Sequence, residues 1–125
     1  MKTGSLLSMK NQYLQFQDNV ASVNKSCCSI HQIISDSDAD QFLTSLSHLP
    51  PVVESLVATI ASKRNEYPEV PNLTILLGMN GVDIANNEMH DCFTKFTPAS
   101  RNSTLQAYHD LVHTTLYSAA DNYPV

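Results

Sequence analysis

Glycine and tryptophan are scarce in this sequence, whose 125 residues include 3 glycines and no tryptophan. Sandwiches and hairpin-rich barrels need many turns with positive φ, so the low glycine count argues against both folds. It also leaves little material for a glycine-rich phosphate-binding loop. The hydrophobic content of 42% excludes a wholly disordered chain, and the length fits one domain. We therefore expect a single domain over residues 1–125, with residues 1–8 flexible.

Positive charge is also scarce, with 7 Lys and Arg against 12 Asp and Glu and a net charge of −5. Because nucleic acids and anionic membranes are bound by basic stripes, we expect neither as a partner. No apolar run approaches the ~20 residues that span a bilayer. Polar residues interrupt the first hydrophobic residues before the core of a signal peptide can form. These features predict a cytoplasmic protein.

The three cysteines are Cys27, Cys28 and Cys92, an odd number that includes an adjacent pair. This arrangement does not indicate a disulfide framework. We expect reduced thiols, as is usual in the cytosol, with Cys27 and Cys92 on apolar helix faces and Cys28 the most exposed.

The longest regular pattern lies near the N-terminus, where apolar residues alternate at spacings of 3 and 4. This repeat is typical of a long helix whose apolar seam packs against other helices. Neither Gly nor Pro occurs between Ser5 and Ser35, so we expect one unbroken helix about 45 Å long. The flanking e and g positions carry one formal charge, which favours an antiparallel bundle or a helix shared with a second copy. The candidate packing and interface seam comprises Leu6, Met9, Tyr13, Phe16, Val20, Val23, Cys27, Ile30 and Ile34.

Capping patterns and prolines divide the rest of the chain into shorter helices. The four residues from Ser35 to Asp38 supply several possible N-caps. Residues 38–41 and 103–106 match the capping box that begins a helix. Pro50 and Pro51 end one helix, and Pro51 suits the first position of the next. The sequence as a whole predicts an all-α fold, a five- or six-helix bundle with a long N-terminal helix.

Residues 72–82 admit two interpretations. The five residues from Leu73 suit a short buried strand, with Asn80 and Gly81 as a hairpin turn. The same two residues also suit the left-handed cap of a helix. We favour the helix because the residues that follow leave little room for a partner strand, and Asp83 then begins another helix as its N-cap.

His109 and His113 form the most distinctive local pattern. Side chains four residues apart face the same way on a helix, which is how zincins present two histidines to one metal. A metal-binding enzyme would need Asp110 in place of the usual glutamate base, and a third ligand such as His90 or Asp91. We expect instead that both histidines edge the core or an interface, and we predict no metal, cofactor or catalytic residue.

Two further clusters fall short of a reactive site. Cys92 and His90 are two residues apart and point away from each other on a helix, so they do not form a thiolate–imidazole pair. Asp36, Asp38 and Asp40 lack the glycine and the closing glutamate of a calcium loop. Helix capping explains these aspartates better.

The segment Met-Lys-Asn-Gln-Tyr-Leu-Gln-Phe-Gln at residues 9–17, in a small, acidic, helical chain, resembles a family of small Legionella metaeffectors. Members of that family inhibit effectors that modify ubiquitin through a transglutaminase-like catalytic domain. The resemblance implies a non-enzymatic inhibitor that covers the active site of such an effector enzyme, self-associates through helices and is delivered to the host cell cytosol. It carries over no functional residue.

The sequence therefore favours a protein-binding module that forms a homodimer. A helix as long as the expected one projects beyond a 125-residue globule with a radius of gyration of ~14 Å, so its uncovered end needs a partner. The alternatives are a secretion chaperone or adaptor, which would hold an unfolded client segment, and the metal-binding enzyme considered above.

Overall fold

The computed structural model describes residues 11, 14–15, 17–19, 21–22 and 25–125. The described residues from 11 to 28 are helical. The prediction of an all-α fold is confirmed for the described residues, which contain no strand. The elements that follow residue 28 are α2 (Asp36–Leu46), α3 (Leu49–Lys63), the short 3-10 helix η1 (Arg64–Glu66), α4 (Asn72–Phe96), the 3-10 helix η2 (Ala99–Arg101) and α5 (Asn102–Ala120).

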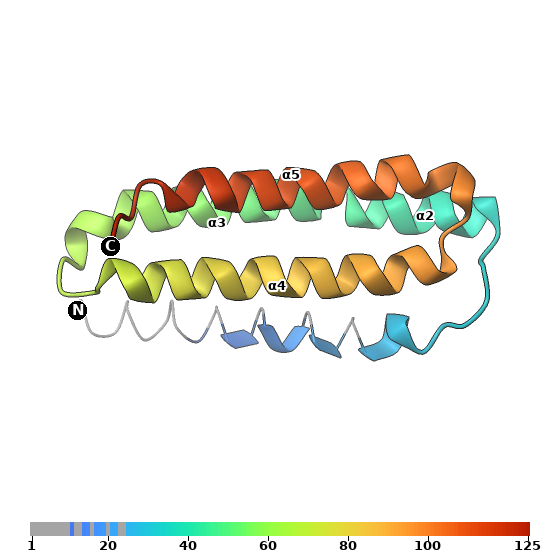
Figure 1. Cartoon of the computed structure of the whole chain (residues 1–125), viewed down its shortest axis with the longest axis horizontal. Helices are drawn as coiled ribbons and strands as arrows, with labels where there is room; N and C mark the ends of the chain where they lie inside the picture. Colours follow the sequence, from blue (N-terminus) through green and yellow to red (C-terminus); the bar gives the residue numbers. More distant parts are fainter. Residues whose placement is uncertain (1–10, 12–13, 16, 20, 23–24) are drawn as a thin grey trace.

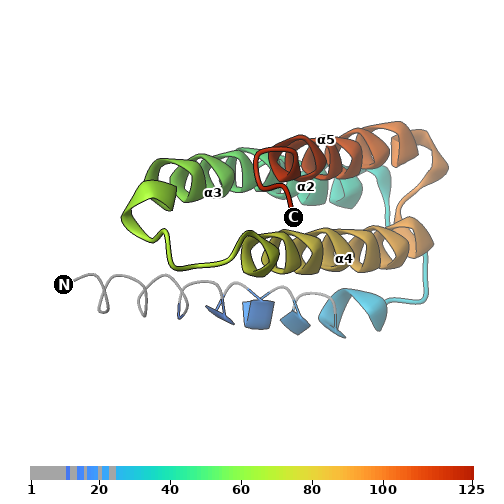
Figure 2. The ribbon, with the colours of Figure 1, turned by 60° about the vertical axis from the view of Figure 1, so that its left-hand side comes forward.

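The helices lie side by side along one long axis (Figure 1). α4 and α5 are antiparallel neighbours, and α3 packs against α5. α2 and α3 lie end to end, and together they form one side of the bundle (Figure 1). The described helical residues before residue 29 follow α4 on the side away from α5, and Figures 1 and 2 agree on this placement.

The N-terminal helix ends at Cys28, so the prediction that it continues to Ser35 is wrong. The Ser29 hydroxyl donates to the Ser26 carbonyl at 2.6 Å and so satisfies one carbonyl of the last turn. The Ile34 amide then donates to the Phe96 carbonyl at 2.9 Å, which ties the connecting segment to the end of α4. Ser35 is the N-cap of α2. A tertiary hydrogen bond and a serine cap therefore end a helix that no glycine or proline interrupts.

Of the N-cap candidates at residues 35–38, the structure uses Ser35, and neither capping box, at residues 38–41 or 103–106, begins a helix. α2 begins two residues before Asp38, whose amide donates to the Ser35 hydroxyl oxygen at 3.1 Å. α5 follows η2 directly, so the backbone at Asn102 is already helical and Ser103 lies inside the helix. α2 ends at Leu46, before the two prolines, and α3 begins at Leu49 with prolines at its second and third positions.

α4 confirms the helical interpretation of residues 72–82, but the helix does not stop at Asn80 and Gly81. It continues to Phe96, and none of the described residues has a positive φ. Asp83 is consequently an interior residue of α4 and not an N-cap. Buried side chains at spacings of 3 and 4 cross the glycine, and their burial outweighs its cost of roughly 1 kcal/mol in a helix. They are Met79, Val82, Asn86, Met89 and Phe93.

The described core has two clusters. One lies between α3, α4 and α5 and comprises Val53, Met79, Val82, Val112, Leu116, Ala119 and Tyr123. The other joins α2, α4 and α5 and comprises Leu43, Met89, Phe93, Phe96 and Leu105.

The second cluster also receives part of the predicted seam. Cys27 and Ile34 are half-buried against it, so these two positions pack within the chain. Ile30 is exposed. The other six seam positions lie outside the described residues; they are Leu6, Met9, Tyr13, Phe16, Val20 and Val23.

Candidate functional site

Three histidines gather at the outer edge of the contact between α4 and α5. His109 and His113 share one face of α5, and their parallel rings have centroids 6.3 Å apart. His90 of α4 lies beside His109 at a centroid distance of 4.5 Å. Tyr117 extends the row from His113 at 5.8 Å. Sequence spacing predicts the pair on α5, but the antiparallel register of the two helices brings His90 to it.

Each ring of the pair on α5 contacts a polar side chain of α4. His113 Nδ1 lies 2.9 Å from Asp83 Oδ1. His109 Nε2 lies 2.6 Å from Asn87 Oδ1. The two histidines therefore link α4 and α5 along the outside of the bundle.

Gln106 connects His90 with Asp110. Its Oε1 lies 3.1 Å from His90 Nε2, and its Nε2 donates to Asp110 Oδ1 at 2.7 Å. The same carboxylate oxygen lies 3.1 Å from His109 Nδ1. Hydrogen bonding to His109 and then to Gln106 lowers the pKa of Asp110 below its ordinary value, so this carboxyl is a fixed negative charge at neutral pH.

The geometry does not resemble the two-histidine metal site of zincins. The ring nitrogens of the pair contact Asn87, Asp110 and Asp83, and the two rings are stacked with an interplanar angle of 1°. In the part of the chain that the structure describes, no three His, Cys, Asp or Glu side chains are arranged to hold a metal ion. These histidines form hydrogen bonds between α4 and α5.

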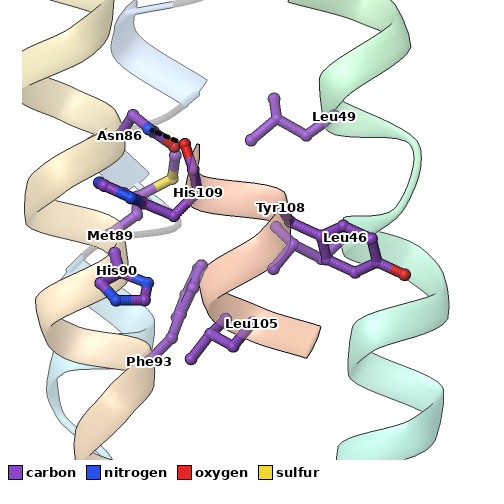
Figure 3. Close-up of a pocket in the computed structure, with 9 residues that line it drawn as sticks. All are labelled: Leu46, Leu49, Asn86, Met89, His90, Phe93, Leu105, Tyr108 and His109. Carbon is purple, nitrogen blue, oxygen red and sulfur yellow. Dashed lines mark hydrogen bonds between the residues drawn. The ribbon is translucent and has the colours of Figure 1, made fainter. Parts of the chain in front are cut away.

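A narrow pocket lies beneath the histidines, between α2, α3, α4 and α5 (Figure 3). It has space for about one water molecule, far less than the roughly 300–1,000 Å³ of a typical ligand site. Buried Asn86 donates from Nδ2 to the His109 carbonyl at 3.2 Å and closes one side. The lining residues are Leu46, Leu49, Asn86, Met89, His90, Phe93, Leu105, Tyr108 and His109.

A disulfide joins Cys28 to Cys92, which corrects the prediction of three reduced thiols. The two Cα atoms are 5.0 Å apart, as disulfide geometry requires, although 64 residues separate them in sequence. The fold alone brings together the end of the N-terminal helix and the last turns of α4, so spacing gives no signal for this pair. Because disulfides persist mainly in oxidising compartments, the cysteines no longer argue for the cytoplasm.

Cys27 is the one free thiol among the described cysteines, and it is half-buried. Burial raises its pKa above the ordinary value, which keeps the thiol protonated at neutral pH. A protonated thiol is a poor nucleophile, so Cys27 is not an activated cysteine.

The aspartates at the start of α2 pair with η2. Arg101 donates from Nε to Asp40 Oδ1 at 2.6 Å and from Nη2 to Oδ2 at 3.2 Å. The Ser100 hydroxyl donates to Asp36 Oδ1 at 3.2 Å. This arrangement fastens the α4–α5 connection to α2, a structural role that the spacing of the aspartates does not indicate.

Exposed apolar side chains form a stripe along the outer face of α4. Leu73, Leu77 and Ile84 are spaced by 4 and 7 residues, which places them on one helix face, and each is about half exposed or more. This stripe is not apparent from the predicted helices, because a helix ending at Gly81 would divide its members between two helices. Tyr117 of α5 is even more exposed, at 72%.

None of the helices formed by the described residues is long and apolar enough to cross a membrane. The chain matches no family model, no curated protein and no solved structure.

Proposed function

We propose that this protein acts by binding another protein, as a non-enzymatic inhibitor of an effector enzyme that modifies ubiquitin. The observation that carries the binding role is the exposed stripe of Leu73, Leu77 and Ile84 on α4. The resemblance of residues 9–17 to metaeffectors supplies the class of target. The pocket beneath the histidines offers space for about one water molecule, which favours a surface over a cleft as the working part of the molecule.

The energetics of association support this use of the stripe. Fully burying an aliphatic side chain is worth roughly 1.5–3 kcal/mol, and all three stripe residues, which are about half exposed, have about half of that gain still to make. A few such anchors carry most of the free energy of a protein–protein interface. A partner that covers α4 would therefore gain more than one that covers the polar outer face of α2.

The test is inhibition of ubiquitin modification by a purified transglutaminase-like effector. We expect stoichiometric inhibition by the intact chain and at least a tenfold weaker effect for Leu77→Asp. Val52→Asp is the matched control, because Val52 is a half-exposed aliphatic residue on α3, away from the stripe. Failure to inhibit, or equal losses in both variants, would contradict the proposal.

Binding measurements with the same purified effector distinguish an inhibitor from a secretion chaperone or adaptor. An inhibitor binds the folded effector enzyme and leaves its helix or sheet content unchanged. An adaptor would bind an isolated, unfolded client segment with similar affinity. We propose the first, and preferential capture of the unfolded segment would favour the adaptor instead.

We also propose a homodimer held by the N-terminal seam, in a five- or six-helix bundle with a long N-terminal helix. The helical residues described between 11 and 28 support the helix. Light scattering at micromolar concentration should report twice the chain mass, and Val20→Asp should halve it. A monomer whose size Val20→Asp leaves unchanged would contradict the dimer.

The proposed site of action is the host cell cytosol, which is reducing. A protein that reaches it through an oxidising compartment would carry the Cys28–Cys92 bond on arrival. Alkylation of thiols at the moment of lysis, followed by mass spectrometry of the recovered chain, would show which redox state acts there.

A further inference from the structure

The helices α4 and α5 carry more negative than positive formal charge. Between Asn72 and Thr94, and again between Asn102 and Ala120, the sequence has no Lys or Arg. The acidic residues of these two stretches are Asp83, Glu88, Asp91 and Asp110. None of the four is buried.

Lys95, in the last turn of α4, is the one basic residue of the two helices, and it lies four residues after Asp91. Of the other described basic residues, three contact oxygen atoms. Arg101 is paired with Asp40 at the start of α2. Arg64 donates to the Tyr67 carbonyl and to Asn72 Oδ1. Lys63 Nζ lies 3.7 Å from Glu66 Oε2. With four carboxylates against one lysine, α4 and α5 together keep a net negative formal charge.

The apolar side chains on this face stand among these carboxylates. Ile84 follows Asp83 in α4, and Asp91 lies seven residues after Ile84 on the same helix face. Tyr117 is tied to this part of α4 through His113, whose ring it contacts and which in turn contacts Asp83. α4 thus contributes an aliphatic side chain, Ile84, and α5 an aromatic one, Tyr117, with carboxylates beside them.

We infer that this surface docks a basic amphipathic helix of the partner protein. We call it the acidic face and define it by Leu77, Ile84 and Asp91 of α4 and Asp110 and Tyr117 of α5. The inference rests on the proposed protein-binding function and adds the chemistry of the partner. A helix with apolar residues every three or four positions and Lys or Arg beside them complements both features of the face.

The charge of the acidic face excludes other occupants. Asp83 and Asp110 contact histidines, but the net formal charge of α4 and α5 is negative and repels nucleic acids and anionic membranes. A second copy of the chain, docked by the same face across a twofold axis, would set the carboxylates of one copy against those of the other. Like charges across an interface are unfavourable, so a basic partner suits the face better than a second copy.

The test uses a synthetic 18-residue helix with leucine on one face and lysine on the other. A matched peptide with glutamate in place of lysine is the control ligand. Fluorescence anisotropy of the labelled peptides against the intact, oxidised chain gives both affinities. We expect the lysine peptide to bind one to one, at least tenfold tighter than the glutamate peptide, and to weaken as salt rises. Equal binding of the two peptides would overturn the inference.

Two charge-reversal variants locate the binding. Asp91→Lys lies on the acidic face, and Glu54→Lys makes the same charge change at an exposed position of α3. We expect Asp91→Lys to weaken lysine-peptide binding at least tenfold and Glu54→Lys less than threefold. Equal weakening would mean that overall acidity and not this face binds the peptide, and would overturn the inference.

Amide chemical-shift mapping with the wild-type chain gives an answer that does not depend on the variants folding. Shifts confined to α4 and α5 around Ile84 and Tyr117 support the inference, and shifts elsewhere contradict it. If the chain inhibits the effector and Leu77→Asp abolishes that inhibition, but the lysine peptide does not bind, the partner chemistry alone is wrong. If the intact wild-type chain also fails to inhibit the effector, the proposed function is wrong as well.

Discussion

Cys28 and Cys92 are 64 residues apart in sequence, and their disulfide fixes the end of the N-terminal helix to α4 with Cα atoms 5.0 Å apart. The contacts on either side of the bond reinforce this attachment. Cys27 and Ile34 both pack against the core cluster between α2, α4 and α5, and the Ile34 amide also donates to the Phe96 carbonyl. The bond therefore lies within a continuous set of contacts that closes one end of the bundle.

Reduction of this disulfide should lower the free energy of unfolding by about 4 kcal/mol on the loop-entropy argument, since it releases a loop of 64 residues. Urea unfolding with and without a phosphine reductant measures the change. Counting thiols in the denatured, unreduced chain should give one, from Cys27, and counting after reduction should give three.

Cys27→Ser is the control for the disulfide, because it removes a half-buried thiol and leaves the bond intact. Its midpoint should still shift on reduction as that of the wild type does, whereas Cys92→Ser should show no response to the reductant. Three reactive thiols in the unreduced denatured chain would show that the bond does not form.

The sequence predicts the helices better than it predicts their ends. Apolar spacings of 3 and 4 identify each helix because the buried stripe is a local property of the chain. The end at Cys28 depends on a hydrogen bond from Ile34 to Phe96, which is 62 positions away and absent from any local window. The disulfide is of the same kind, since the fold determines which cysteines meet.

The candidate sites divide in the same way. The spacing of His109 and His113 is a local property of the sequence. Their partners on α4 depend on the register in which two antiparallel helices pack, which the sequence does not show. The stripe on α4 was within reach of sequence reasoning, because Leu77 and Ile84 are seven residues apart. If Gly81 ended the helix, Leu77 and Ile84 would belong to two different helices and would form no common stripe.

Gly81→Ala tests that correction directly. Gly81 lies in the middle of α4 with a negative φ, so alanine should raise the free energy of unfolding by roughly 0.5–1 kcal/mol. At a left-handed cap the same change would be destabilising, because a Cβ atom disfavours positive φ. Ala85→Gly on the same helix is the control and should cost about 1 kcal/mol. Thermal unfolding of both variants decides, and a destabilised Gly81→Ala would favour a cap at this position.

The ion pair of Asp40 and Arg101 should make part of the stability pH-dependent. The hydrogen bond from Arg101, followed by its positive charge, holds the pKa of Asp40 below its ordinary value. The stability contributed by this carboxylate is therefore full above the unfolded-state pKa near ~3.9, and is lost as the pH falls through the lower folded-state value.

Arg101→Ala should consequently lower the urea midpoint at pH 7, and its difference from wild type should shrink as the pH falls below about 4. Asp40→Asn should lower the urea midpoint in the same way. The loss of stability in the variant with both changes should not exceed the sum of the losses in the two single variants. A deficit of Arg101→Ala that stays constant down to pH 2 would show that the arginine acts through packing alone.

Asn86 should discriminate sharply between an apolar and an acidic replacement. Its side chain is 5% exposed, and Nδ2 donates to the His109 carbonyl. Asn86→Leu forfeits one hydrogen bond, at about 1 kcal/mol. Asn86→Asp places a desolvated carboxylate against the oxygen of that carbonyl and should cost roughly 3 kcal/mol or more at pH 7. Because burial raises the pKa of such a carboxyl, a protonated acid can donate to the same carbonyl, and the cost should shrink between pH 7 and pH 5. Urea unfolding at both pH values measures this. Equal costs for the two variants at pH 7 would mean that position 86 is open to water and that the α4–α5 contact is looser than the structure shows.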